Sequence, residues 1–231
     1  MFRLSRNPSD LQFPPVELAS PEGLLAVGGD LQPKRLLEAY RHGIFPWYNE
    51  DQPSLWWSPG PRAVIFPDKL HVSRSLERTI RREPFTLTLD NGFREVMTEC
   101  ASPRPQYPEG GTWISPAMIE AYTTLHEMGH AHSIETWLEG QLVGGLYGVA
   151  IGGAFFGESM FSRVDDTSKV ALVTLVRQLH KWGFTLFDCQ QSSPHIQRLG
   201  AEDLPRAEFV KCLAAAVKLP DRRGRWQFNS E

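Results

Sequence analysis

Residues 142–163, LVGGLYGVAIGGAFFGESMFSR, contain the pattern that is most informative about the fold. It is apolar and aromatic, and Gly152-Gly153 in its middle is a two-residue turn signal for an antiparallel hairpin. A second signal of this kind, Glu139-Gly140, stands just before it. We therefore expect three strands, 133–138, 141–151 and 154–161, to form an antiparallel meander.

Downstream of the meander, residues 168–182 place apolar side chains on one helical face and end before Gly183. A strand-like run, 184–190, and a helical region, 205–217, follow. Meander, helix, strand and helix in this order resemble an acetyltransferase-like fold. The predicted class is mixed α/β, or α+β.

Upstream of the meander, strand-like and helical segments alternate. We expect strands at 63–66 and 85–89 and helices at 73–82, 91–100 and 115–129. Ser115 is the expected cap of the last helix, with Pro116 at its first position.

The first 60 residues are rich in Pro, Gly and Trp and contain one helical stretch, which Asp30 can cap and Gly43 can end. This composition is typical of a small, loop-rich domain. The predicted division is therefore a small N-terminal domain, 1–61, and a larger domain, 62–231.

Composition excludes several classes of protein. With 41% apolar and 22% charged residues among 231, the chain has the composition of a globular protein. The apolar stretch 142–156 is interrupted by five glycines and is too short to span a membrane. No apolar block follows MFRLSRNPSD, and three scattered cysteines predict no disulfide framework. We expect a cytoplasmic protein with no membrane partner.

Charge is unevenly distributed along the chain. Residues 107–167 hold one basic and eight acidic side chains, whereas 168–231 hold ten and six. The segment 73–82 adds a stripe of arginines on one helical face: Arg74, Arg78, Arg81 and Arg82. The stripe is typical of a helix that follows phosphates and equally of a solvated basic face.

The pentapeptide His126-Glu127-Met128-Gly129-His130 matches HExxH, in which two zinc ligands lie one helical turn apart with a glutamate base between them. A third ligand is not evident, because Ser133 and Thr136 stand where a longer zinc motif would place Gly and His. The expected helix also ends at Gly129. Packing histidines are the favoured interpretation, and a zinc peptidase is one alternative function.

Asp188-Cys189-Gln190 closes a mostly apolar strand. Strand alternation predicts that Asp188 and Gln190 share one face and that Cys189 points to the other. The carboxylate is then either buried with partners or at the end of the sheet beside a cleft. Cys189 could act as a nucleophile with His195 as its base, but alternation favours a core position for Cys189.

Four tryptophans lie in segments predicted as loops: Trp47, Trp56, Trp57 and Trp113. Aromatic side chains on loops can stack on nucleic-acid bases. For Trp56 and Trp57 we favour a role in the core. The glycines at 144–145, 148 and 152–153 indicate either strand bulges or the floor of a cleft.

Together these stretches closely resemble the leucyl/phenylalanyl-tRNA–protein transferases, the bacterial aminoacyltransferases of the N-end rule pathway. The resemblance covers nearly the whole chain. It is carried by GLLAVGGDL (23–31), GIFPWY (43–48), WWSPGPRAV (56–64), GGTWI (110–114), HEMGHAHSIETW (126–137), residues 142–163, SK (168–169), DCQ (188–190), LGA (199–201) and PR (205–206).

The resemblance implies a small N-terminal domain packed on a larger acetyltransferase-like (GNAT) domain. It also implies transfer of Leu or Phe, and less often Met, from aminoacyl-tRNA to the α-amine of proteins that begin with Arg or Lys, which creates a degradation signal. We expect a monomer. No cofactor is expected, because an aminoacyl ester is already activated. A non-catalytic tRNA-binding module is the second alternative.

The resemblance further implies roles for single residues. Asp188 acts through Gln190 to orient and deprotonate the amine, and Glu158 lines the site. Trp47 and Trp113 hold the terminal adenosine of the tRNA, and the arginine stripe contacts the tRNA. The pocket for the transferred side chain comprises Leu146, Phe155, Met160 and Leu175; Leu146 and Leu175 depart from the methionine and phenylalanine expected there in some relatives.

Overall fold

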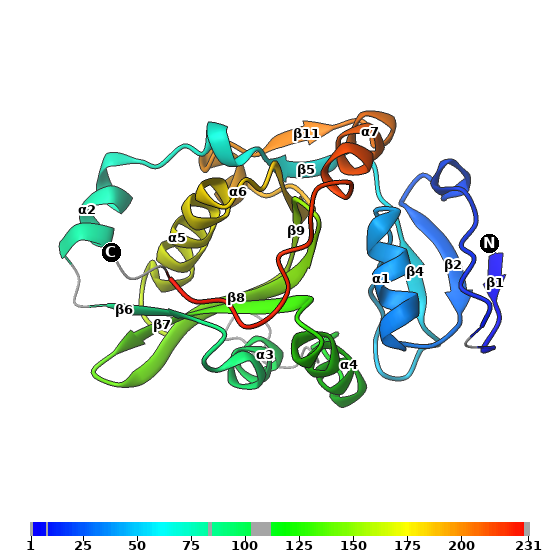
Figure 1. The fold of residues 1–231 in the computed structure, drawn as a ribbon, viewed down its shortest axis with the longest axis horizontal. Coiled ribbons are helices and arrows are strands. Elements are labelled where there is room, and N and C mark those ends of the chain that lie inside the picture. Colours follow the sequence, from blue (N-terminus) through cyan, green and yellow to red (C-terminus); the bar gives the residue numbers. More distant parts are fainter. Residues whose placement is uncertain (1, 8, 83–84, 103–111, 229–231) are drawn as a thin grey trace.

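The structure is a computed structural model and describes residues 2–7, 9–82, 85–102 and 112–228. The strands form two sheets, one in a small N-terminal region and one in a larger region, and helices accompany both sheets. The predicted mixed α/β fold with a small N-terminal domain is therefore confirmed (Figure 1). The proline-rich insert 102–108, to which the sequence assigns no role, lies outside the described residues except for Ser102.

The small domain is built on a four-stranded sheet of order β1-β2-β4-β3. Its elements are β1 (Phe2–Leu4), a 3-10 helix (Val16–Leu18), β2 (Leu24–Gly28), α1 (Pro33–Arg41), β3 (Phe45–Pro46) and β4 (Leu55–Trp57). Trp56 is fully buried and donates from Nε1 to the carbonyl of Gly28 at 2.8 Å, which confirms its role in the core.

Helix α1 begins later than predicted. Gln32 is its N-cap and Pro33 occupies its first turn, where the missing N–H of proline costs no hydrogen bond. Asp30 instead accepts hydrogen bonds from the backbone N–H of Gln32 and from Arg35, so the predicted Asp30 cap is wrong. Gly43 follows the helix with φ +73°, a conformation that favours glycine.

The larger domain is built on a seven-stranded sheet of order β11-β5-β10-β9-β8-β7-β6. The predicted meander is confirmed as β7 (Ala131–Leu138), β8 (Gln141–Ile151) and β9 (Ala154–Ser162). Glu139 and Gly140 both take positive φ in the first turn, as a two-residue hairpin requires.

After the meander come α5 (Thr167–Lys181), β10 (Leu186–Gln190), α6 (Pro194–Arg198), β11 (Glu202–Leu204) and α7 (Arg206–Ala216). This is the order expected of an acetyltransferase-like domain. Helix α5 connects β9 to β10, which pair in parallel, and a parallel pair needs such a crossover. The short elements α6 and β11 were not predicted, because three to five residues carry no clear periodicity.

Upstream, the chain forms β5 (Arg62–Ile65), a 3-10 helix (Pro67–Lys69), α2 (Arg74–Arg82), β6 (Thr86–Leu89), α3 (Phe93–Ala101) and α4 (Pro116–Glu127). Helix α5 covers one face of the large sheet, and α3 and α4 cover the other (Figure 1). Ser115 caps α4 by accepting a hydrogen bond from the N–H of Met118, as predicted.

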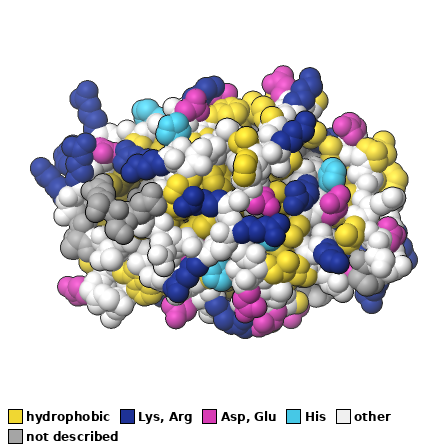
Figure 2. Space-filling model, viewed as in Figure 1, with side chains coloured by type: hydrophobic (Ala, Val, Ile, Leu, Met, Phe, Trp, Pro, Cys, Tyr) yellow, Lys and Arg dark blue, Asp and Glu magenta, His cyan; other side chains and the backbone are white. Residues whose placement is uncertain are grey.

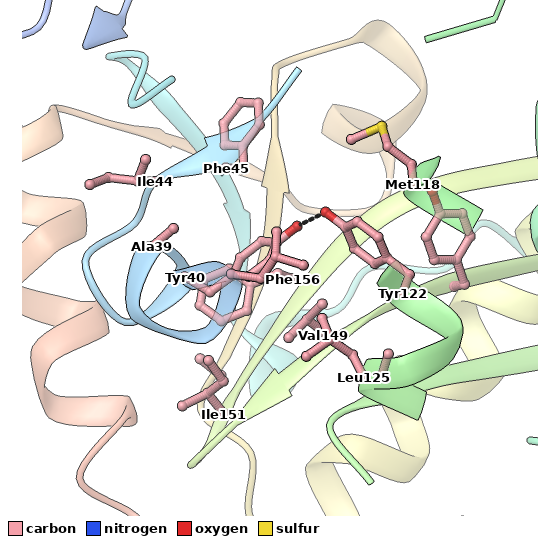
Figure 3. Packing of buried hydrophobic residues seen from close by; sticks show 14 of the residues in the cluster. Ala39, Tyr40, Ile44, Phe45, Met118, Tyr122, Leu125, Val149, Ile151 and Phe156 are labelled. Atoms are coloured by element: carbon pink, nitrogen blue, oxygen red, sulfur yellow. Dashed lines mark hydrogen bonds between the residues drawn. The ribbon is translucent and has the colours of Figure 1, made fainter. Parts of the chain in front are cut away.

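The two domains share one hydrophobic core. Helix α1 faces the larger domain, and Tyr40 packs against Phe156 and Tyr122 (Figures 1 and 3). Burying an aromatic ring of this size contributes roughly 1.5–3 kcal/mol to stability. This shared core fixes the small domain against the part of the large sheet where β8 and β9 lie.

Along the chain, the small sheet is completed by β4, which ends at Trp57, and the large sheet starts with β5 at Arg62. The predicted boundary between residues 61 and 62 falls at this connection, and its position stays a prediction. Among the helices described, none combines the length and the apolar composition that a membrane crossing needs.

Candidate active site

Two cavities open where the parallel strands β9 and β10 stop pairing. Their last paired residues are Phe156 and Asp188. The apolar cavity is lined by Leu146, Gly157, Glu158, Ser159, Met160, Leu172, Phe187, Cys189 and Ile196. The polar cavity is lined by Phe45, Pro46, Trp47, Trp113, Gly157, Glu158, Cys189, Gln190 and Gln191. Glu158 therefore lies at the junction of the two.

A bulge in β9 directs Glu158 into this junction. Tyr147 of β8 pairs with Ser159 and Gly148 pairs with Gly157, so Glu158 is the extra residue on its strand. Gly148 makes the bulge possible, because a Cβ at that position would lie 2.2 Å from the carbonyl oxygen of Phe156. A strand bulge, one of the two interpretations of this glycine, is therefore correct.

A second bulge lies in β10. Asp188 pairs with Val64 of β5 and Gln190 pairs with Ala63, so Cys189 is the extra residue, and Gln190 takes a φ of +63°. The simple alternation predicted from the sequence is therefore wrong. Cys189 is half-buried: it packs against the edge of the core, as predicted in part, and also lines both cavities. Burial raises the pKa of its thiol, which argues against a thiolate nucleophile.

Asp188 is sealed in the interior. Its carboxylate accepts from Nε of Arg62 at 2.8 Å and from Nη2 at 2.7 Å, and both side chains have no exposed area. The Arg62 guanidinium also lies over the rings of Phe45 and Phe209. Oδ1 of Asp188 accepts a further bond from the backbone N–H of Gln190 at 2.8 Å. Asp188 thus fixes the backbone of Gln190 without lining either cavity.

Glu158 receives its hydrogen bonds from neutral groups. The side-chain amide of Gln190 donates to Oε1 at 2.8 Å, and the hydroxyl of Tyr122 donates to Oε2 at 3.2 Å. Burial raises the pKa of Glu158 to about 7, although hydrogen bonds from Tyr40, Tyr122 and Gln190 act in the opposite direction. A carboxylate with this pKa exchanges a proton readily near neutral pH.

The two predicted stacking tryptophans stand in the wall of the polar cavity. Trp47 follows β3 and is 41% exposed, and Trp113 precedes α4. Trp57 supports Trp47, since its Nε1 donates to the Trp47 carbonyl at 2.7 Å and the two rings lie 5.6 Å apart. Trp47 is thereby fixed by Trp57 while much of its side chain stays exposed.

Of the four residues expected around the transferred side chain, Leu146 and Met160 line the apolar cavity, and they are register partners on β8 and β9. Phe155 and Leu175 are buried and do not line it; Phe155 stacks on Phe187 with ring centres 5.2 Å apart. Sequence reasoning missed Leu172 and Ile196. Leu172 belongs to the predicted apolar face of α5, whereas Ile196 lies in a short helix that carries no comparable signal.

The arginine stripe lies on α2, away from both cavities. The four arginines of this helix are all exposed: Arg74, Arg78, Arg81 and Arg82. Leu76 of the same helix is buried against the rest of the protein. Glu77 on the same helix pairs with Arg81 and with Arg177 of α5. Figure 2 shows Lys and Arg side chains gathered at the end of the molecule that α2 occupies in Figure 1.

The HExxH pentapeptide does not form a zinc-peptidase arrangement. Helix α4 ends at Glu127, which is exposed, and Gly129 with φ +76° turns the chain away, so His130 is not on the helix. His126 approaches Asp90 and His132 instead. Asp90 is already engaged, because it accepts from His132 Nδ1 at 2.8 Å and from the N–H of Trp226 at 2.6 Å.

Comparison with known proteins identifies the family of the chain. The family model for leucyl/phenylalanyl-tRNA protein transferase matches residues 64–214, and the model for the N-terminal domain of that transferase matches 29–60. A leucyl/phenylalanyl-tRNA–protein transferase from Nitrosomonas eutropha is 53% identical, over 96% of this chain and 94% of the relative. That from Stutzerimonas stutzeri is 58% identical, over 91% and 93%.

Similar solved structures include L-PGS from Bacillus licheniformis, which is 14% identical over 73% of this chain and 53% of that chain, with a TM-score of 0.42. A GCN5-related N-acetyltransferase from Kribbella flavida is 14% identical over 73% and 60%, with a TM-score of 0.40. Likenesses of this size carry no conclusion about the present chain. The family models and the close relatives do: the chain belongs to the leucyl/phenylalanyl-tRNA–protein transferase family.

Proposed function

We propose that this transferase moves Leu or Phe, and less often Met, from aminoacyl-tRNA to the α-amine of proteins that begin with Arg or Lys, with Glu158 as the base. The observation that carries the assignment is the position of Glu158 at the junction of an apolar cavity and an aromatic-walled cavity. The apolar cavity suits the transferred side chain, and the other suits the tRNA end and the acceptor.

The chemistry requires a base of modest strength. The α-amine has an ordinary pKa of about 7.7–8.0 and is mostly protonated at pH 7, whereas only the neutral amine attacks an ester. Glu158, with a pKa of about 7, accepts the proton with little mismatch. The neutral amine then attacks the ester carbonyl carbon, the bond to the ribose oxygen breaks, and Glu158 returns its proton to that oxygen. The second proton that the nitrogen loses on becoming an amide passes to the regenerated carboxylate and from there to solvent.

Gln190 and Asp188 act around this step. The Gln190 amide holds Oε1 of Glu158 and borders the polar cavity, so it can also contact the incoming amine. Asp188 is a positioning residue, since it contacts the backbone of Gln190 from the interior. The resemblance implied that Asp188 is the base and acts through Gln190. We propose instead that Glu158 is the base and that Asp188 only positions Gln190.

The remaining contacts follow from the two cavities and the surface. Trp47 and Trp113 are placed to stack on the terminal adenosine, a contact worth about 1–3 kcal/mol per base. Leu146, Met160, Leu172 and Ile196 enclose the transferred side chain. The exposed arginines of α2 are proposed to bind phosphates of the tRNA. We further propose that the protein acts in the cytoplasm and as a monomer.

The test is a transfer assay with labelled Phe-tRNA and an Arg-initiated peptide, without added metal. Glu158→Gln should lower the single-turnover rate at pH 7 by about 10²–10⁴-fold, because the positioned base is lost. Glu127→Gln is the matched control. It changes an exposed glutamate, so transfer should persist unaltered. Full activity of Glu158→Gln would remove Glu158 from the chemistry.

The same assay separates the two alternatives. A zinc peptidase would cleave the peptide and would lose that cleavage in Glu127→Gln, while a tRNA-binding module would yield no Phe-peptide and would bind charged and uncharged tRNA equally.

A further inference from the structure

A chain of buried hydroxyl groups leads from the small domain to Glu158. The hydroxyl of Tyr40, on α1, forms a hydrogen bond with the hydroxyl of Tyr122, on α4 (Figure 3). Tyr122 in turn donates to Oε2 of Glu158 at 3.2 Å. Both tyrosines have no exposed area. The chain therefore crosses the interface between the two domains and ends on the group at the junction of the cavities.

We propose that Tyr40 and Tyr122 are positioning residues of the transfer reaction, which favour and orient the carboxylate form of Glu158 through this chain of hydrogen bonds. The proposal rests on the role of Glu158 as the base. It gives the small domain a direct part in the chemistry, because Tyr40 is the residue through which that domain reaches the base.

The direction of the chain follows from the chemistry of its members. A carboxylate only accepts hydrogen bonds, so Tyr122 must donate to Glu158, and its oxygen then accepts from Tyr40. Burial raises the pKa of both phenols well above 10, which keeps them protonated as donors. Hydrogen bonds to a charged acceptor are stronger than those between neutral groups, and a second donor polarises the first.

The other groups around Glu158 come from three strands. Asp188 of β10 opposes the ionised form, and its charge is balanced by Arg62 of β5. The thiol of Cys189 stays neutral because burial raises its pKa. Tyr147 of β8 is close enough to sense the charge of Glu158. Among the groups facing Glu158, the donors are thus Gln190 from one side and the two tyrosines from the other.

Tyr147 offers a matched control. Like Tyr40 and Tyr122 it is fully buried, and its ring packs edge-on against Tyr122 with centres 5.9 Å apart. Its hydroxyl has no hydrogen-bond partner within the described residues. Tyr147→Phe therefore removes a buried phenol from the same cluster without shortening the chain. Simple packing damage would appear in this variant as much as in the other two.

The experiment measures the single-turnover rate of Phe transfer from pH 5.5 to 8.5 in the full chain and in Tyr122→Phe, Tyr40→Phe and Tyr147→Phe. Losing a donor disfavours the carboxylate, so the pH at which the rate is half its plateau should rise. We expect a rise of about one unit in Tyr122→Phe and in Tyr40→Phe, since both phenols favour the ionised form of Glu158, and none in Tyr147→Phe. Above pH 8, the transfer rates of the tyrosine variants should approach the plateau rate of the protein without substitutions.

Unmoved midpoints in both Tyr122→Phe and Tyr40→Phe would overturn the proposal, and so would an equal shift in Tyr147→Phe. If one variant fails to fold by circular dichroism, the other is decisive, because each breaks the chain. Glu158→Gln separates this inference from the proposed function. If Glu158→Gln leaves the midpoint of the acid limb unchanged, Glu158 is not the base. If it moves that midpoint up to the pKa of the acceptor amine, about 7.7–8.0, while the tyrosine variants leave it in place, only the present inference fails.

Discussion

Asp188 is the last residue of β10 that pairs with β9, Glu158 lies on β9 two residues beyond its partner, Phe156, and the surroundings of the two carboxylates differ sharply. Asp188 is fully buried against a guanidinium that binds both of its oxygens. Glu158 is half-buried, borders both cavities, and is bound by an amide and a phenol. The same functional group thus serves as a fixed anchor in one place and as an exchangeable proton acceptor in the other.

The difference shows that the partner, and not burial alone, decides what a carboxylate can do. A cation in contact stabilises the charged form, while neutral donors offset only part of the desolvation that raises the pKa of Glu158 to about 7. The two bulges, at Glu158 and Cys189, separate these environments by turning one carboxylate outward and leaving the other inside.

The largest expected effect follows from removing Arg62, the cation that pairs with the buried carboxylate of Asp188. Arg62→Met should lower the free energy of unfolding by about 3–5 kcal/mol, because it leaves the buried charge of Asp188 without its partner. Urea unfolding at pH 7 measures this. The control is Arg94→Met, which breaks the exposed pair with Glu120 and should leave the urea midpoint nearly unchanged. Equal midpoints for the two variants would mean that the Arg62–Asp188 pair is not an anchor.

The next effect concerns Glu158 and stability against pH. Its folded pKa of about 7 exceeds the unfolded value of 4.5, so the folded state binds more protons between these values. Stability should therefore fall as pH rises from 4.5 to 7, by on the order of 3 kcal/mol. Glu158→Gln removes this loss and should be the more stable protein at pH 8, as measured by urea unfolding at several pH values. A parallel pH dependence in both proteins would contradict the comparison.

A smaller effect distinguishes the lining of the apolar cavity from the layer beneath it. Leu146→Ala should change the ratio of Leu to Phe transfer by roughly 10-fold or more, since a pocket discriminates by about 1–3 kcal/mol per methylene. Leu175→Ala should lower stability by about 2–5 kcal/mol and leave this ratio nearly constant, because Leu175 is buried outside the lining. Competition between the two charged tRNAs measures the ratio. A larger change in Leu175→Ala would restore its predicted place in the pocket.

The smallest effect is on tRNA affinity. Arg78→Gln combined with Arg82→Gln should weaken binding and reduce the dependence of log Kd on log salt by about two, one for each lost phosphate contact. Arg94→Gln, also exposed but on α3, is the control. Filter binding across a salt series measures the slope. An unchanged slope would identify the α2 face as merely solvated.

Much of the fold was predictable because strong local signals specify it. Glu139-Gly140 and Gly152-Gly153 set the hairpins, and Ser115 with Pro116 set the start of α4. The cap of α1 was misplaced because Asp30 uses its carboxylate for Arg35, a tertiary contact that local sequence does not show. The short elements α6 and β11 are stabilised by their neighbours and not by a periodic pattern.

The candidate site was predictable in composition but not in geometry. The resemblance supplied Asp188, Gln190 and Glu158, yet alternation failed at both bulges, which depend on how β8, β9 and β5 pair across the sheet. The partner of Asp188 is Arg62, which lies 126 residues away in the sequence. Tyr40 and Tyr122 carried no signal of their own, because an aromatic residue at a helical core position is ordinarily a packing residue.

The most direct measurement of the central claim is the titration of Glu158 itself by NMR, with 13C-labelled glutamate and assignment by loss of the signal in Glu158→Gln. We predict a midpoint near pH 7 for this carboxyl group. A midpoint near the ordinary value of 4.5 would contradict it, because Glu158 would then be ionised throughout the neutral range and too weak a base for the amine.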